Sequence, residues 1–345
     1  MDKRTGKRYK NDRIEVGGDK SLYELFDVFY HAKIAEGRAL RTLEMYRESF
    51  RYLCEYLEAR GIERTLTAVT TEELRSFTAY LLHEKRKWDG HPHKSEANMT
   101  VGLDPVTVNT KIGKLRTMFN FLEADGHILH NPFAKVRKVR EPEKEIRIMT
   151  EDELKLMLAA PDQRTYVGFR DFVLMNVLLD SFARISEVVT LDEDSVDTVH
   201  GSIYINEKIA KSRKGRTIPI QKRTARLIAE LRKECADFGT ELIFCTNYGG
   251  KLTDDRVRER LKEYAEKAGV NINVHPHLFR HTAATMFLAN GGSEIYLQKL
   301  MGHADLRMLE KYAHPSAESI REKHDKFSPV NNVISGLQRP RRTKR

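Results

Sequence analysis

The first half of the chain alternates apolar and polar residues with the period of an α-helix. Apolar residues recur at helical spacing in four segments: 21–37, 42–61, 70–88 and 106–126. The residues that open two of them, Ser21 and Thr70, are each followed three positions later by glutamate, as in a capping box. Residues 87–105 are polar, contain Gly and Pro and lack periodicity, which predicts a loop. The pattern therefore predicts four helices before residue 127.

The second half mixes helical periodicity with one short region typical of strands. Helices are predicted over 151–160, 169–191, 222–234, 255–269, 278–291, 296–302 and 305–313. Residues 202–206 and 216–220 favour strands, and 207–215 favours a hairpin turn between them. The fold class is thus mainly α with a small β-sheet, an α+β protein.

A charged segment without a sustained core face, 134–149, separates the halves, and Thr150 with Glu153 forms a capping box just after it. We expect five parts: a basic tail 1–16, a helical domain 17–138, a linker 139–149, a second domain 150–330 and a basic tail 331–345.

Composition adds a candidate partner. Sixty Lys+Arg against fifty Asp+Glu give a net charge of +10, as expected of a nucleic-acid binder, although many other basic proteins share it. Three isolated cysteines suggest neither a disulfide framework nor a Cys-based zinc site. No apolar run is long enough to span a bilayer, and no signal peptide precedes residue 20, so we expect no membrane association and a cytoplasmic protein.

Two clusters carry arginine or lysine in settings that suit an anion. In SFARISEVVTL, Arg184 lies three residues before Glu187, which alone predicts a surface ion pair, but the apolar stretch before it indicates partial burial. In KSRKGRTIP, Lys211 and Lys214 lie at the expected hairpin tip. Such a tip can present a lysine to a phosphate, but taken alone a charged hairpin tip is more often simply solvated.

Two further clusters carry histidine and tyrosine. In HPHLFRHTA, His277 and Arg280 share a helical face near a helix start, where backbone amides favour an anion. Zinc is the rival, but Leu278 stands where the metalloprotease motif needs glutamate. In GHADLRMLEKYAH, Tyr312 follows His303 by nine residues, and periodicity alone makes it a packing residue.

One reaction would use all four clusters together. Cleaving a phosphodiester without metal needs fixed cations around the phosphate, a nucleophile and a proton donor for the leaving oxygen. Arginine binds phosphate in bidentate fashion, tyrosine can act as nucleophile, and lysine or histidine can supply the proton.

In this order, ARISE, KSRKGRTIP, HLFRH and GH followed by Tyr, the second half resembles the catalytic domain of the tyrosine recombinase (phage integrase) family. The helical first half, closing with Asn131-Pro132, resembles the family's core-binding (SAM-like) domain. The resemblance implies a C-shaped clamp and a site-specific recombinase that acts on duplex DNA through a 3′-phosphotyrosyl intermediate, without cofactor or metal.

By the same resemblance, each site residue takes a role. Arg184 and Arg280 would clamp the scissile phosphate, with His277 as general acid/base and His303 as a hydrogen-bond donor. Lys211 would protonate the leaving 5′-hydroxyl, with Lys214 as its competitor.

Tyr312 would be the nucleophile, and Glu187 would be structural. Phe182 departs from the family pattern, which has glycine two residues before the first arginine.

The resemblance further implies a homo-tetramer on DNA, a monomer or weak dimer when free, and accessory DNA-bending proteins. The setting would be a mobile element or replicon in a prokaryotic cytoplasm. Two alternatives are a type IB topoisomerase and a DNA-binding regulator on the same scaffold.

Overall fold

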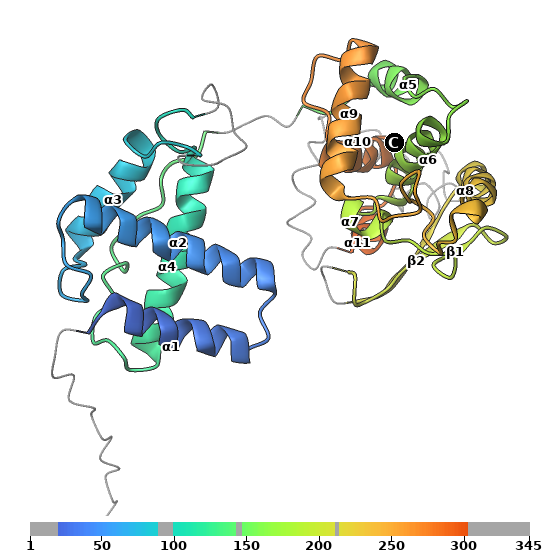
Figure 1. Ribbon diagram of the computed structural model, residues 1–345. Helices are drawn as coiled ribbons and strands as arrows, with labels where there is room; N and C mark the ends of the chain where they lie inside the picture. The colour runs from blue at the N-terminus through green and yellow to red at the C-terminus, as the bar shows by residue number, and fades with distance from the viewer. Residues whose placement is uncertain (1–19, 89–98, 143–146, 211–213, 303–345) are drawn as a thin grey trace, which may run out of the picture. The chain divides into compact units, whose positions relative to one another are not determined.

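The computed structural model describes residues 20–88, 99–142, 147–210 and 214–302, and the chain divides into two compact units, Met1–Glu145 and Ile146–Arg345 (Figure 1). Each unit has its own hydrophobic core. In the parts that the structure describes, no helix has the length and apolar character needed to cross a membrane. The residue bounds given above for the five parts, and the C-shaped clamp, stay predictions.

The first unit is built from helices, as the apolar periodicity predicts. Its elements are α1 (Leu22–Ala35), α2 (Leu40–Ala59), α3 (Thr71–His83) and α4 (Pro105–Ala124). The apolar faces meet in one core, because residues three and four apart lie on the same side of a helix and leave water together. Thr70 caps α3 by accepting from the Glu73 amide, whereas Ser21 accepts from Tyr23 rather than from residue 24.

The chain that leaves α4 is fastened back onto that helix. The Asn109 side chain donates to the Val139 carbonyl (2.9 Å) and accepts from the Val139 amide (2.8 Å). Arg116 donates to the Val136 carbonyl at 2.7 Å. The segment 136–139 therefore belongs to the first unit by contact, although its charged composition resembles a linker.

The second unit packs helices around a small sheet. Its helices are α5 (Glu151–Ala159), α6 (Tyr166–Ser181), α7 (Ile185–Val188), α8 (Lys222–Cys235), α9 (Asp254–Ala268), α10 (Pro276–Ala289) and α11 (Glu294–Met301), with a 3₁₀ turn at Ala236–Phe238. The strands β1 (Val196–Asp197), β2 (Ser202–Ile205) and β3 (Arg216–Pro219) form an antiparallel sheet in that order. The two expected strands are confirmed, and β1 was not expected.

One prediction about this unit is wrong. Residues 169–191 do not form a continuous helix, because α6 ends at Ser181 and α7 begins only at Ile185. Phe182 between them adopts a left-handed conformation, with φ 54° and ψ 17°. Arg184 is consequently the N-cap of α7 and not a residue inside a longer helix.

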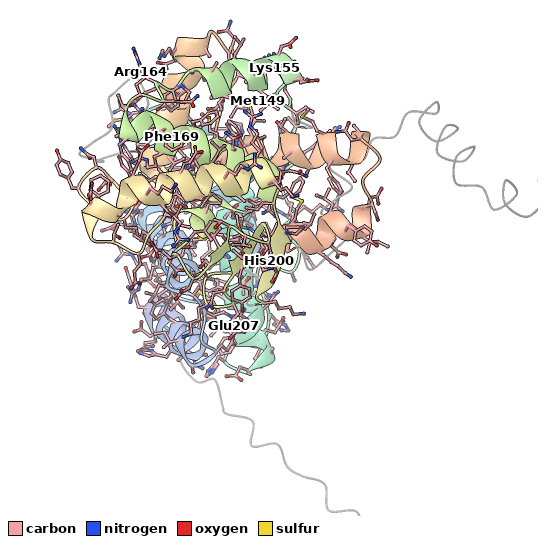
Figure 2. The ribbon with its side chains drawn as sticks, turned by 90° about the vertical axis from the view of Figure 1, so that its right-hand side faces the viewer. Met149, Lys155, Arg164, Phe169, His200 and Glu207 are labelled. Atoms are coloured by element: carbon pink, nitrogen blue, oxygen red, sulfur yellow. The ribbon has the colours of Figure 1, made fainter. Side chains whose placement is uncertain are left out.

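The start of the second unit is tied to its centre. Thr150 and Glu153 form the predicted capping box of α5. The amide of Met149, labelled in Figure 2, donates to the Thr282 hydroxyl of α10 at 3.1 Å. Buried Asp171 of α6 accepts from Arg260 and Tyr264, both on α9. These bonds tie the start of the second unit to α10, and α6 to α9.

Candidate active site

The break between α6 and α7 places Arg184. The Ser181 hydroxyl accepts from the Ala183 amide at 3.2 Å, so the chain turns within two residues of the helix end. The Arg184 amide then donates to Glu187 Oε2 at 2.8 Å, and its Nη1 donates to Glu187 Oε1 at 3.2 Å. The Arg184 side chain is mostly buried, as the apolar stretch before it predicts.

Glu187 is the anion beneath Arg184. Its side chain is 1% exposed and also accepts two bonds from Arg216, at 3.1 and 2.7 Å. Burial by itself raises the pKa of Glu187, but the bonds from Arg216 and the Arg184 amide, with the two guanidinium charges, hold that pKa below its usual value. One ionised carboxylate therefore faces two guanidinium groups, which leaves positive charge for a further anion.

Arg280 reaches the same segment from α10. It is 4% exposed and donates to the Phe182 carbonyl and, at 2.9 Å, to the Met301 carbonyl. Arg184 lies within the stretch 182–187 and is bound there to Glu187. Arg280 is bound to the same stretch through the Phe182 carbonyl. The structure brings together two arginines that are 96 residues apart in the sequence.

His277 lies in the first turn of α10, as predicted, and is exposed. Partial desolvation by its surroundings lowers the pKa of His277, and the positive charges of Arg280, His275, Arg258 and Arg184 lower it further. The imidazole therefore favours its neutral form beside a cluster of cations. In that form one ring nitrogen can accept a proton, as a general base requires.

Three predicted site residues, Lys211, His303 and Tyr312, lie outside the described residues. Lys214 is described and exposed just before β3. Gly302 ends α11 with φ 63°, which confirms the predicted helix break immediately before His303 in the sequence. The roles of all these residues stay predictions.

The described residues of the candidate site are two arginines, a histidine and a buried glutamate. Within the described ranges, no group of three or more His, Cys, Asp or Glu residues is placed to hold a metal ion. Two fixed guanidinium groups can neutralise the charge that develops on phosphate oxygens during in-line attack. They need not reorganise to do so, because protein carbonyls and a buried carboxylate already hold them.

Two groups that hold the site arginines in place could not be identified from the sequence motifs. Arg216 reads as one member of a basic hairpin tip, yet its guanidinium is buried against Glu187. The Phe182 carbonyl carries no chemical signal in a sequence, although the unusual residue at that position marks the backbone there. Helical periodicity cannot predict long-range contacts such as these.

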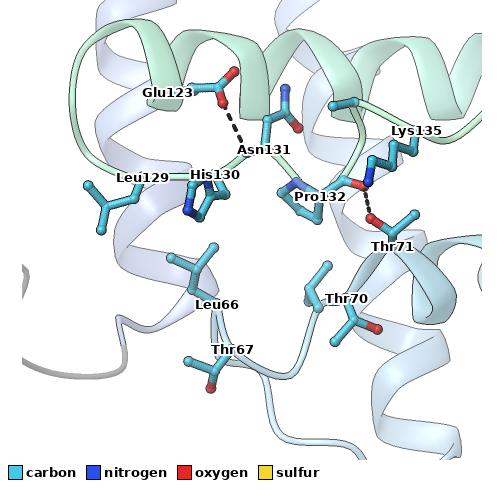
Figure 3. Close-up of a pocket in the computed structure, with 12 residues that line it drawn as sticks. Leu66, Thr67, Thr70, Thr71, Glu123, Leu129, His130, Asn131, Pro132 and Lys135 are labelled. Carbon is cyan, nitrogen blue, oxygen red and sulfur yellow. Dashed lines mark hydrogen bonds between the residues drawn. The ribbon is translucent and has the colours of Figure 1, made fainter.

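The first unit contains a cavity of about 580 Å³ (Figure 3). It lies between the start of α3 and the chain after α4, where Thr71 donates to the Pro132 carbonyl and Glu123 accepts from the Asn131 amide. It contains none of the predicted site residues.

Comparison with known proteins identifies the family of the chain. The phage integrase family matches residues 147–319, and the phage integrase SAM-like domain matches residues 21–139. Tyrosine recombinase XerD of Listeria innocua serovar 6a is 25% identical over 315 residues, which are 89% of this chain and 99% of that protein. Tyrosine recombinase XerC 2 of Ralstonia nicotianae is 29% identical over 90% of this chain and 86% of its own length.

Solved structures share the fold. The Tn1549 transposon integrase, solved with a circular intermediate DNA, superposes with a TM-score of 0.68 at 19% identity, covering 89% of this chain and 99% of that one. The family match spans half of the chain and contains Arg184, Arg216, His277 and Arg280. The chain therefore belongs to the phage integrase family and is a site-specific tyrosine recombinase, an enzyme that cleaves and rejoins DNA.

Proposed function

We propose that this recombinase exchanges strands of duplex DNA by two transesterifications per strand. The Tyr312 oxygen attacks the scissile phosphorus and forms a 3′-phosphotyrosyl bond, while the bond to the 5′-oxygen breaks and that oxygen takes a proton. The 5′-hydroxyl of a partner strand then attacks the phosphotyrosine and releases Tyr312. The phosphodiester energy is conserved in the covalent intermediate, so neither ATP nor a cofactor enters the balance.

The observation that supports this proposal is the joint anchoring of Arg184 and Arg280 on the stretch 182–187. Both would bind non-bridging oxygens of the scissile phosphate, and His277 would act as general acid/base beside them. His303 would donate to the same phosphate. Lys211 would protonate the leaving 5′-oxygen, and Lys214 is the alternative proton donor.

The assembly on DNA follows from the reaction. Exchange between two duplexes needs four cleavages, so we propose a tetramer on DNA that forms from monomers or weak dimers, with accessory DNA-bending proteins where the site requires them. The relatives are bacterial recombinases and a transposon integrase, which supports integration, excision or resolution of a mobile element or replicon in a prokaryotic cytoplasm.

Type IB topoisomerase activity and a purely DNA-binding role are the alternatives, and the family relatives favour neither. The experiment is recombination of a plasmid that carries two copies of the native site, recovered from host DNA by binding selection. Wild type should yield resolved or inverted products, whereas a topoisomerase would relax the plasmid without a site and a regulator would leave it unchanged.

The same assay tests the arginine pair. Replacing Arg184 or Arg280 with Ala should slow recombination by at least about 100-fold, the cost of losing one oxyanion-binding group. Arg164→Ala is the matched control, because the side chain of Arg164, labelled in Figure 2, is 90% exposed and pairs with Asp162. Recombination at the wild-type rate by either site variant would contradict the proposed roles.

A further inference from the structure

The guanidinium of Arg216 joins three elements of the second unit. Its Nη1 and Nη2 donate to the two oxygens of Glu187, and its Nε donates to the Leu300 carbonyl at 2.9 Å. Arg216 opens β3, Glu187 lies in α7, and Leu300 lies in the last turn of α11. The side chain is 9% exposed, so these bonds form away from water.

The chain packs closely around this group. A side chain at Gly302 would place its Cβ 3.1 Å from the Arg216 Cζ and Nη1 atoms, and Gly302 also adopts a left-handed φ of 63°. Only glycine satisfies both conditions without displacement. The end of α11 therefore fits against the Arg216 guanidinium, one residue before His303 in the sequence.

The two arginines share the Glu187 carboxylate unequally. Arg216 binds both oxygens in a fork, and the Arg184 amide takes a further position on Oε2. Among the described residues, the Arg184 side chain makes a single hydrogen bond, from Nη1 to Oε1 at 3.2 Å. A carboxylate binds a guanidinium best through two parallel hydrogen bonds, and Glu187 already makes this pair of bonds with Arg216.

This unequal sharing leaves the Arg184 guanidinium able to bind a further anion. With Arg216 in place, the carboxylate is neutralised and the remaining N–H groups of the Arg184 guanidinium are not drawn into a second fork. Without Arg216, Glu187 would form that fork with Arg184 and cancel its charge. The arginine would then turn toward the protein and away from a phosphate.

We propose that Arg216 is a positioning residue for DNA cleavage: by saturating Glu187, it keeps the Arg184 guanidinium available to the scissile phosphate. The inference rests on the proposed function, because it assumes that Arg184 binds that phosphate. Arg216 itself need not touch the DNA.

The test compares Arg216→Lys with wild type in single-turnover cleavage, on DNA with an ordinary scissile phosphate and on DNA with a neutral methylphosphonate there. Lysine keeps a positive charge near Glu187 but cannot form the fork or reach the Leu300 carbonyl at the same time. We expect cleavage of ordinary DNA to fall on the order of 100-fold, as for other small misplacements of catalytic groups.

The methylphosphonate separates positioning from general structural damage. It removes the negative oxygen that Arg184 would neutralise, so the Arg216→Lys defect should shrink below about tenfold on this DNA. Circular dichroism and DNA affinity should match wild type, as they should for the control Arg164→Lys. An equal defect on both DNAs, or wild-type cleavage by Arg216→Lys, would overturn the inference.

A second pair of variants applies if Arg216→Lys does not fold. Arg216→Gln leaves Glu187 charged and able to capture Arg184, whereas Arg216→Gln with Glu187→Gln removes that carboxylate. The double variant should cleave faster than the single one, and a double variant that is no faster overturns the inference. Absence of any wild-type adduct would instead refute the proposed function, and the inference with it.

Discussion

At the scale of single residues, Phe182 shows how an unfavourable backbone conformation is retained. A left-handed φ costs a non-glycine residue about 1–2 kcal/mol. The Phe182 ring is 8% exposed, packs with the apolar side of α10 and α11, and meets the Phe287 ring edge-on at a centroid distance of 5.5 Å. Burial of such a ring contributes roughly 2–3 kcal/mol, which outweighs the backbone cost. The same conformation directs the Phe182 carbonyl to Arg280.

This balance predicts an unusual order of stabilities at position 182. Phe182→Ala keeps the left-handed strain and loses the ring, so it should destabilise by about 3–5 kcal/mol. Phe182→Gly loses the same ring but relieves the strain, so it should be about 1 kcal/mol more stable than the alanine variant. Urea unfolding measures both.

Phe172, equally buried but within α6, provides the control. There the alanine variant should be the more stable one by about 1 kcal/mol, because glycine is unfavourable inside a helix. If the alanine variant were also more stable than the glycine variant at position 182, the left-handed backbone there would not be strained.

The lowered pKa of His277 predicts a pH dependence of stability. A histidine whose folded-state pKa lies below the ordinary value of about 6.5 binds fewer protons when folded than when unfolded. As pH falls through about 6.5, the unfolded chain takes up the proton first, and the folded state loses stability. Above that pH the group is neutral in both states and the effect vanishes.

The measurement is urea unfolding of wild type and His277→Asn between pH 8 and pH 5.5. The stability of the variant relative to wild type should rise as the pH is lowered. A difference that stays constant with pH, or that changes in the opposite direction, would show that desolvation and the surrounding cations do not lower the pKa of His277.

At the scale of elements, local periodicity predicts the helices and remote contacts set their ends. The helices of the first unit, the hairpin pair β2–β3 and the break at Gly302 follow from residues close in sequence. The interruption at Phe182 does not, because the groups that stabilise it lie on α10 and α11, about 100 residues later. Periodicity through 169–191 therefore predicts one helix where there are two.

Some residues of the candidate site can likewise be predicted from the sequence, and others only from the fold. The spacing of Arg184, His277 and Arg280 follows the family motifs, so the sequence indicates these residues directly. The partnership of Arg216 with Glu187 requires the chain to fold first, since 29 residues separate the two. Composition alone places Arg216 on a solvated tip.

The attachment of the segment 136–139 to α4 yields a further prediction at this scale. Asn109→Asp keeps an acceptor for the Val139 amide but loses the donor to the Val139 carbonyl, and it places a carboxylate near Glu141, which now accepts from Asn109 at 2.7 Å. The first unit should lose about 1–3 kcal/mol of stability. Amide hydrogen exchange should accelerate more at 136–139 than within α1, whose amides respond only to the loss of stability of the whole unit.

The matched control is Asn176→Asp on α6 of the second unit, whose side chain bonds only to the Phe172 carbonyl of its own helix turn among the contacts described. It should leave exchange at 136–139 unaffected. Unchanged exchange there in Asn109→Asp would mean that the bonds to Val139 do not hold the segment.

At the scale of the whole molecule, the arginines proposed to bind the phosphate come from distant parts of the sequence and are brought together by folding. Arg184, Arg216 and Arg280 meet around the ends of α7 and α11, and the net charge of +10 favours a polyanionic substrate. The family relationship then supplies the reaction that such a cluster serves. The proposed nucleophile of that reaction is Tyr312.

The most direct measurement uses a DNA substrate with its native site and a nick beside the cleavage position, so that the short released fragment diffuses away and resealing stops. Wild type should accumulate a covalent protein–DNA adduct, and mass spectrometry of the nuclease-trimmed adduct should place the nucleotide on Tyr312. Tyr312→Phe should bind the same DNA with unchanged affinity and form no adduct. No adduct from wild type, or an undiminished adduct from Tyr312→Phe, would contradict the account.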